Sequence, residues 1–142
     1  MPSLDTNVLV RHLVRDDERQ TAQAGLLISN YYDALEALFV PLTVTLELEW
    51  VLRSAYGVTK PGVLNLYNRL LESRELSFQD EEGLERALFL YRNANVDFAD
   101  CLHATAAHSH NRLPLVIFDR KAARLAEVEL LRSPAISRPE TD

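Results

Sequence analysis

The sequence predicts an α/β fold in which a mostly parallel central sheet is flanked by helices on both faces. Short apolar segments that suit buried strands alternate with longer segments of helical periodicity, and this alternation is typical of parallel sheets. The chain has 142 residues, 47% of them hydrophobic and 25% charged, so one globular domain can bury a core without disulfides. We expect this domain to span residues 1–132, with residues 133–142 as a loose tail.

The first half of the chain opens with a very short apolar strand, Ser3-Leu4, that ends at Asp5. A short helix follows it to Val14, and a run of acids at 16–18 begins a second helix that extends to about Leu35. The next expected elements are a strand at 38–41, a helix at 43–56 that ends near a glycine, a helix at 59–73 and a weak strand at 76–78.

The second half continues the alternation, and its clearest strand covers residues 114–118. The other expected elements are a helix at 80–94, a helix from 97 to about 110, a short helix at 120–126 and a last strand at 128–131. In open parallel sheets, ligands bind beyond the carboxyl ends of the strands. The residues that directly follow strands are therefore the first candidates for a functional site.

Two aspartates occupy this position, Asp5 after Ser3-Leu4 and Asp119 after residues 115–118. Both are candidates for the crevice at the strand ends. Aspartate is also a common helix N-cap, and the sequence leaves this second interpretation open for each residue.

Glu47 and Glu49 lie on one predicted helix, where helical spacing separates them. Glu47 is three residues after Val44 and four before Val51, so it lies beside or within the apolar stripe. Glu49 is four residues before Arg53 and suits an exposed ion pair. An unpaired carboxylate in a core is costly, so Glu47 needs a cation or a hydrogen-bond partner unless it is partly exposed at the edge of the stripe.

Asp97 and Asp100 stand three residues apart at the start of another predicted helix. They suit an N-cap and third helical position, although the third position of a capping box prefers Glu or Gln. The other interpretation makes Asp100 a metal ligand and Asp97 its helper. If Asp5, Glu47, Asp100 and Asp119 share one crevice, each pair at about 4 Å costs roughly 4 kcal/mol at an effective dielectric of 20. Such a cluster predicts a divalent cation, and carboxylates without histidine suit Mg²⁺ or Mn²⁺.

Four segments follow one another across nearly the whole chain: Leu4–Arg11, Leu46–Leu52, Asp97–Leu102 and Phe118–Lys121. In order and spacing, they resemble the motifs of PIN-domain ribonucleases, in particular VapC-type toxins of toxin–antitoxin pairs. One departure is Ile117, because many relatives carry Ser or Thr two residues before the last aspartate.

The resemblance implies a PIN-like three-layer α/β/α fold and an endoribonuclease that depends on Mg²⁺ or Mn²⁺. It implies a site of four acids that are both catalytic residues and metal ligands: Asp5, Glu47, Asp100 and Asp119. Asp97 is implied as a supplementary acid, and Thr6 or Asn7 could orient Asp5. The resemblance also implies a cognate antitoxin that inhibits the enzyme, and a homodimer.

Basic residues near the strand-end acids are candidates for holding RNA phosphates: Arg11, Arg15, Arg120, Lys121 and Arg124. Ordinary surface charge is the alternative for each of them. The formal net charge is −6, the opposite sign from a dedicated nucleic-acid binder, so an RNA substrate requires a local basic surface.

Other residues carry weaker signals. Trp50 could stack on a base, although packing in the core or at an interface is the interpretation we favour. Cys101 and His103 are two residues apart on a predicted helix, as are His108 and His110, so neither pair shares a face for a metal.

The expected cellular location of the protein rests on three features that the sequence lacks. The single cysteine excludes an intrachain disulfide, no apolar run approaches the roughly 20 residues that span a bilayer, and no basic segment leads into an apolar stretch at the N-terminus. We therefore expect a cytoplasmic protein without a membrane partner.

Three other functions remain as alternatives. A haloacid-dehalogenase-like phosphatase requires a second aspartate two residues after the first, where this chain has Asn7. A receiver domain requires an acidic pair and a phosphorylated aspartate on a middle strand, and the sequence shows neither. A PIN-fold binding module without catalysis is the non-enzyme alternative, and the presence of all four acids argues against it.

Overall fold

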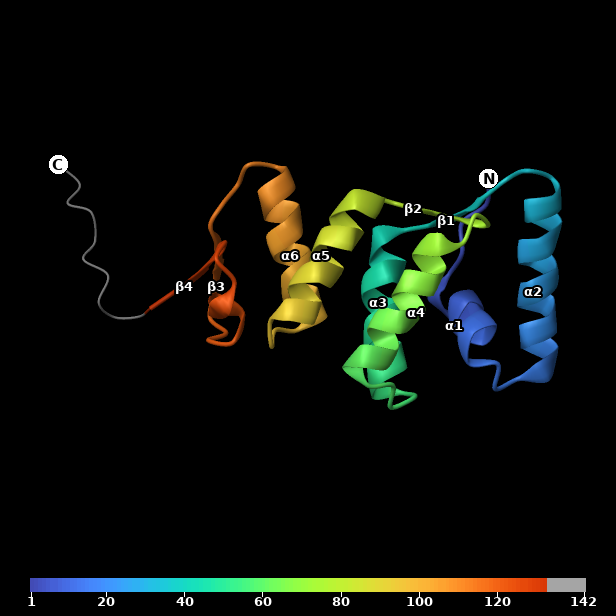
Figure 1. The fold of residues 1–142 in the computed structure, drawn as a ribbon, viewed down its shortest axis with the longest axis horizontal. Helices are drawn as coiled ribbons and strands as arrows, with labels where there is room; N and C mark the ends of the chain where they lie inside the picture. The colour runs from blue at the N-terminus through green and yellow to red at the C-terminus, as the bar shows by residue number, and fades with distance from the viewer. Residues whose placement is uncertain (133–142) are drawn as a thin grey trace. The chain divides into compact units, whose positions relative to one another are not determined.

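The computed structural model describes residues 1–132, and the predicted tail at 133–142 lies outside this range. The described elements are α1 (Thr6–Val14), α2 (Glu18–Asp33), β1 (Leu38–Val40), α3 (Leu42–Ser54), α4 (Lys60–Glu72), β2 (Leu76–Phe78), α5 (Glu81–Asn93), α6 (Phe98–Ser109), β3 (Leu115–Ile117), the 3-10 turn η1 (Ala122–Arg124) and β4 (Val128–Leu130) (Figure 1). The chain divides into two compact units, Met1–Glu82 and Gly83–Asp142.

The first unit contains a small parallel sheet. β1 and β2 pair in parallel, with Phe39 opposite Ser77. The N-terminal segment runs beside β1, because Ser3 forms a parallel bridge with Phe39 and the backbone N–H of Leu4 donates to the carbonyl of Phe39 at 2.8 Å. Asp5 therefore stands where the chain leaves this sheet and enters α1.

The helices of the first unit enclose an apolar core. α1 packs against α2 and α3, and α3 packs against α4 (Figure 1). The hydroxyl of Tyr67 in α4 donates to the carbonyl of Thr45 in α3, so its polar end is satisfied inside this core. The side chains that are fully buried here come from both helices and strands: Leu9, Leu38, Leu48, Leu52, Val63 and Tyr67.

The second unit combines α5 and α6 with a second parallel pair of strands. β3 and β4 pair with Leu115 opposite Val128. Tyr91 of α5 packs edge-on against Phe98 of α6, with ring centroids 5.4 Å apart, and this contact joins the two helices. β3 packs against α6, so the residues that follow β3 are held near this helix.

A charged cluster ties the segment before β4 to both helices of the second unit. Arg86 of α5 forms an ion pair with Glu127 and donates to the hydroxyl of Thr105 at 3.4 Å. The Nδ1 atom of His108 lies 3.1 Å from Oε1 of Glu127. The backbone carbonyl of Glu127 also accepts from the N–H of Leu115 at 2.9 Å, which fixes the start of β3.

The structure confirms an α/β fold with parallel strands and places four of the five expected strands within about a residue of their predicted ranges. The expected strand at Ser3-Leu4 is reduced to the isolated bridge between Ser3 and Phe39. The strands form two sheets of two strands each, whereas we expected one central sheet. Hydrophobic patterning indicates where strands lie but not which of them share hydrogen bonds. The predicted helix at 120–126 is wrong, because only the short turn η1 forms and the chain is already extended at Leu125.

None of the described helices is both long enough and apolar enough to cross a membrane.

Candidate metal centre

The start of α6 presents two carboxylates. Asp97 occupies the N-cap position with extended backbone, but its side chain accepts no capping hydrogen bond. Asp100 lies in the first turn of the same helix, half-buried, whereas Asp97 is exposed. The capping box is therefore not formed, and neither carboxylate is used to satisfy the backbone at this helix end. Asp100 is favoured here as a negative charge near a helix N-terminus.

Asp119 reaches the same place from another element. It follows β3 after one intervening residue, and its Oδ1 atom accepts the backbone N–H of Lys121 at 2.8 Å. This bond is an Asx turn and not a helix N-cap, because the N-cap residue of η1 is Lys121. The N-capping interpretation of Asp119 is therefore wrong. The bond orients the carboxylate and engages one of its two oxygens, while the residue itself is exposed.

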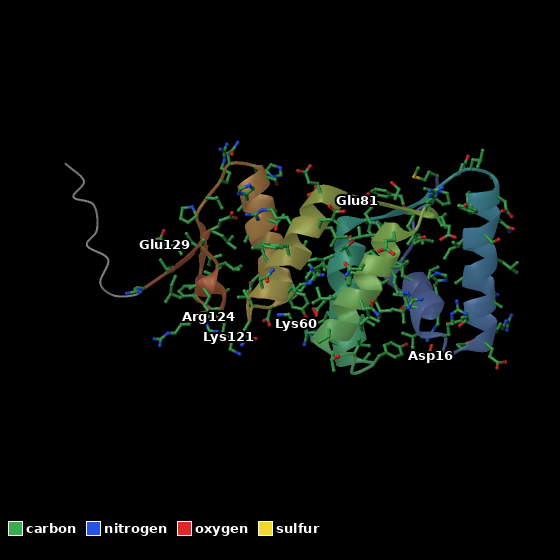
Figure 2. All side chains as sticks on the ribbon, in the orientation of Figure 1. Asp16, Lys60, Glu81, Lys121, Arg124 and Glu129 are labelled. Carbon is green, nitrogen blue, oxygen red and sulfur yellow. The ribbon has the colours of Figure 1, made fainter. Side chains whose placement is uncertain are left out.

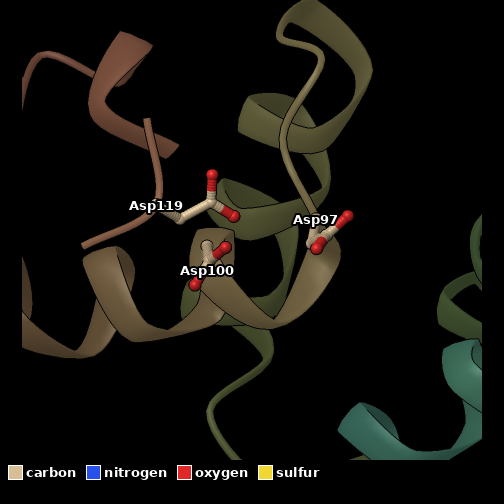
Figure 3. A group of neighbouring side chains, drawn as sticks. All are labelled: Asp97, Asp100 and Asp119. Atoms are coloured by element: carbon tan, nitrogen blue, oxygen red, sulfur yellow. The ribbon is translucent and has the colours of Figure 1, made fainter. Parts of the chain in front are cut away.

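Asp97, Asp100 and Asp119 lie together in the second unit (Figure 3). One carboxylate oxygen from each residue lies within 4.8 Å of the others. Octahedral Mg²⁺, with oxygens at about 2.0–2.1 Å, places adjacent ligands about 3 Å apart and opposite ligands about 4.2 Å apart. The upper limit of 4.8 Å is close to the second of these distances, and oxygen-only donors suit Mg²⁺ or Mn²⁺. The three residues therefore fit a divalent cation.

The electrostatics of Asp100 agree with a site that favours a cation. Partial burial raises the pKa of the Asp100 carboxyl above its ordinary value, and the negative charges of Asp97 and Asp119 raise it further. The nearby His103 acts in the opposite direction on this pKa. A positive ion among the three carboxylates would remove their mutual repulsion.

Asp5 and Glu47, the two other predicted acids, lie in the first unit, and both are exposed. Asp5 is the N-cap residue of α1, as its second interpretation required, yet its side chain makes no capping hydrogen bond. Of the two residues that could orient Asp5, Thr6 is buried and Asn7 lines a hollow of about 280 Å³ formed by α1 and α2.

The structure exposes Glu47, the alternative that the sequence left open, and buries Glu49, which was expected to be exposed. The Glu49–Arg53 ion pair is confirmed at 3.1 Å, but Glu49 is only 4% exposed and Glu47 is exposed. The buried face of α3 is rotated toward Thr45 and Glu49, whereas the apolar stripe read from the sequence was centred nearer to Val51. The placement of Glu49 on an exposed face was therefore wrong.

Trp50 lies on the same helix and does not belong to the core. Its side chain is 60% exposed, so core packing is wrong as an interpretation and an interface role stays a prediction. The rotation of the buried face of α3 toward Thr45 leaves Trp50 on the opposite side of the helix.

The five basic residues proposed for RNA phosphates differ in their surroundings. Arg11 forms an ion pair with Asp16 at 2.5 Å, and its guanidinium also donates to Gln20 and Tyr56. The other four are exposed: Arg15, Arg120, Lys121 and Arg124. Arg15 ends α1 in the left-handed conformation. Arg120 and Lys121 follow Asp119 directly in sequence, and the backbone N–H of Lys121 donates to its carboxylate.

Two residues beside this cluster were not linked to it from the sequence, and His103 was considered only as a metal pair with Cys101. His103 is three residues after Asp100 on α6, and that spacing alone would have placed the two side chains on one helix face. Phe118 was assigned to the strand at 114–118, but it is 75% exposed and immediately precedes Asp119. Its position next to a strand-end acid was the available signal.

Comparison with known proteins gives one positive finding. The PIN domain matches residues 3–128, which is well over half of the chain. No curated protein and no solved structure matched. PIN domains are in general nucleases that bind divalent metal, which agrees with the acidic group at the start of α6. On the extent of this match, the chain belongs to the PIN domain family.

Proposed function

We propose that this protein is a metal-dependent endoribonuclease and that Asp97, Asp100 and Asp119 hold its catalytic cation. The observation that carries this proposal is the approach of their carboxylate oxygens to within 4.8 Å of one another in a chain of the PIN family. Asp5 and Glu47 are further catalytic acids in this proposal, supported by their motifs and by the exposure of both side chains.

Bound Mg²⁺ or Mn²⁺ would supply a Lewis acid for the scissile phosphate and a water that ionises near neutral pH. The chain contributes positioning. Half-buried Asp100 is fixed in the first turn of α6, and Asp119 is oriented by the N–H of Lys121, which leaves its second oxygen for the cation. Exposed Asp97 is the least constrained of the three and suits the role of a supplementary ligand.

Arg120 and Lys121 would bring the RNA backbone to this acidic site. Both are exposed, and neither forms an ion pair within residues 1–132. Their charges offset the negative charge of Asp119 and its neighbours locally, although the chain as a whole carries −6. Such residues add affinity for any RNA sequence and make binding dependent on salt.

The test is cleavage of an end-labelled RNA by wild type and by Asp100→Asn, in Mg²⁺, in Mn²⁺ and in EDTA. Loss of a group that stabilises transition-state charge slows cleavage by a factor of about 100 or more. Glu85→Gln is the matched control, because Glu85 is an exposed acid on α5 of the same unit and lies outside the acidic group. Undiminished cleavage in EDTA, or by Asp100→Asn, contradicts the proposal.

The same preparation separates the alternatives. Release of phosphate from small esters without RNA cleavage identifies a phosphatase. If neither substrate is turned over and RNA is still bound, the protein is a PIN-fold binding module.

We also propose that the nuclease is a toxin that acts in the cytoplasm, as a homodimer, and is neutralised by a cognate antitoxin. The resemblance of its four motifs to VapC-type toxins supports this role. No lysine or arginine within residues 1–132 forms an ion pair with Asp97, Asp100 or Asp119, so a basic side chain of a partner protein could complement them. The test is to express this protein in cells, alone and together with the product of the neighbouring gene, and to measure growth and binding between the two proteins. Harmless expression and no binding by that product contradict the toxin role and leave the nuclease proposal standing.

A further inference from the structure

A hollow beside Asp119 combines an exposed aromatic ring with three arginines. Phe118 is 75% exposed, and within residues 1–132 its exposed fraction is higher than that of any other aromatic side chain. The hollow has a volume of about 660 Å³, within the range of ligand sites. Its principal lining side chains are three apolar and three basic ones: Phe118, Leu130, Leu131, Arg120, Arg124 and Arg132.

The arginines of this hollow lack the carboxylate partners that three other arginines of the chain have. Arg11, Arg53 and Arg86 each have a carboxylate partner. Arg124 and Arg132 are exposed and, like Arg120, form no ion pair within the described part of the chain. Arg124 and Lys121 lie on the turn that follows β3, as Figure 2 shows. A local positive surface therefore stands out on a chain of net charge −6.

We propose that Phe118 is a stacking platform for one unpaired base of the RNA substrate, and that the arginines around it hold the flanking phosphates. The proposal deepens the nuclease function and rests on it. Phe118 directly precedes Asp119, with their Cα atoms about 3.8 Å apart, so the chain itself links this platform to one of the three carboxylates. Aromatic rings with arginines are the means by which proteins hold single strands without sequence preference.

Single-stranded RNA fits this hollow better than a protein segment does. Every base offers a flat π-face to the ring, and every nucleotide brings a phosphate to the arginines. An acidic peptide would satisfy the arginines but would leave the exposed ring without a matched partner. A protein partner is therefore the alternative that the experiment must distinguish.

The first measurement is the fluorescence anisotropy of a labelled oligoadenylate hexanucleotide in EDTA, where cleavage does not occur. Stacking of one base on an aromatic ring contributes to the free energy of binding, and its loss in Phe118→Leu should weaken binding by about fivefold or more. Phe118→Trp should retain the affinity. The control is Phe89→Leu, because Phe89 is an exposed phenylalanine on α5 that does not line the hollow. It should bind like wild type.

The salt dependence separates stacking from charge. Arg124→Gln should lower the slope of log affinity against log salt by about 0.7, the value for one phosphate contact on a single strand. Phe118→Leu should leave that slope unchanged. Hexanucleotides with one abasic position should reveal the stacked base, since the effect of Phe118→Leu disappears when that base is missing.

Equal affinity of wild type and Phe118→Leu for every hexanucleotide overturns the platform. Loss of self-association or of antitoxin binding in Phe118→Leu, with RNA affinity intact, also overturns it and identifies a protein interface. Neither result affects the nuclease proposal, which is tested by cleavage in Asp100→Asn. Conversely, if RNA binding depends on Phe118 but no metal-dependent cleavage is found, the stacking platform is supported and the nuclease proposal is contradicted.

Discussion

Replacing Asp100 with asparagine measures the electrostatic cost of the acidic group, because the substitution removes the charge and keeps nearly the same shape. Without metal, we expect Asp100→Asn to be more stable than wild type at neutral pH. The reason is that Asp100 is half-buried and faces the negative charges of Asp97 and Asp119, which together raise its pKa. An acid kept at such a cost is expected of a functional site.

The size of the effect follows from the spacing of the charges. The carboxylate oxygens of Asp97 and Asp119 lie within 4.8 Å of that of Asp100. At about this distance, one like-charge pair costs roughly 0.9 kcal/mol in water and roughly 3.5 kcal/mol at an effective dielectric of 20. Both neighbours are exposed, so the lower value applies, and the two pairs sum to about 2 kcal/mol. Asp100→Asn also loses a favourable negative charge at the N-terminus of α6, which reduces this gain in stability by about 0.3–1 kcal/mol.

The net gain of about 1–2 kcal/mol corresponds to a rise in melting temperature of about 2–6 °C for a chain of this length. The pH dependence has a definite sign. Because the folded pKa of Asp100 is raised, the folded wild type binds more protons than the unfolded chain above the ordinary pKa of 3.8. Wild type therefore loses stability as pH rises through the raised pKa. The advantage of Asp100→Asn is absent below pH 3.8 and complete at neutral pH.

The assay is thermal unfolding followed by circular dichroism, in EDTA and in millimolar Mg²⁺ or Mn²⁺. Metal should stabilise wild type by mass action, by about 2.7 kcal/mol at 100 times the dissociation constant, and should stabilise Asp100→Asn much less. Glu85→Gln controls for the loss of one negative charge elsewhere in the same unit. Equal melting temperatures of wild type and Asp100→Asn in EDTA at neutral pH, with equal responses to metal, would refute the reasoning.

Four other substitutions separate catalytic, electrostatic and packing roles. Glu47→Gln should abolish most RNA cleavage without changing the melting temperature, whereas Glu49→Gln should lower stability by about 1–2 kcal/mol because Glu49 is buried in its ion pair; comparing kcat and melting temperature of both variants checks this. Asp16→Asn should lower stability at neutral pH, and the difference should disappear in melts at decreasing pH, since the ion pair with Arg11 lowers the pKa of Asp16 and its stabilising effect is lost on protonation. Arg86→Gln should destabilise the protein by about 1–2 kcal/mol in urea unfolding, because it leaves a partly buried carboxylate with one partner fewer.

Much of the local structure could be predicted because periodicity and capping residues report it directly. The start of α2 illustrates this, since Asp17 caps the helix by accepting the N–H of Gln20 at 3.0 Å. The sharp chain reversal near Gly57 is another example, because a positive φ of 63° favours glycine. Strand pairing could not be predicted from the hydrophobic pattern, because strands of three residues alternate too briefly to specify which strand lies beside them.

The sequence predicted most of the residues of the candidate site, but it predicted their arrangement in space only in part. Position after a strand identified Asp119, and position at a helix start identified Asp97 and Asp100, so the sequence anticipated the residues that the second unit gathers. The exposure of Glu47 was left open, and the burial of Glu49 was missed, because helical spacing fixes the angle between two residues but not the orientation of the helix against its core.

The charged cluster around Glu127 has a consequence for genetic experiments. Its backbone holds the start of β3, its side chain is anchored by Arg86 and His108, and β3 carries the chain to Asp119. Among residues 1–132, one buried carboxylate oxygen of Glu127 has no hydrogen-bond partner, so the loss of Arg86 or His108 would leave this side chain still less satisfied. If expression of the protein inhibits growth, survivors selected for its inactivation should carry changes at Arg86 and Glu127 as well as in the acids themselves. The inactivating positions would then form two separate groups in the chain, one of which touches no substrate.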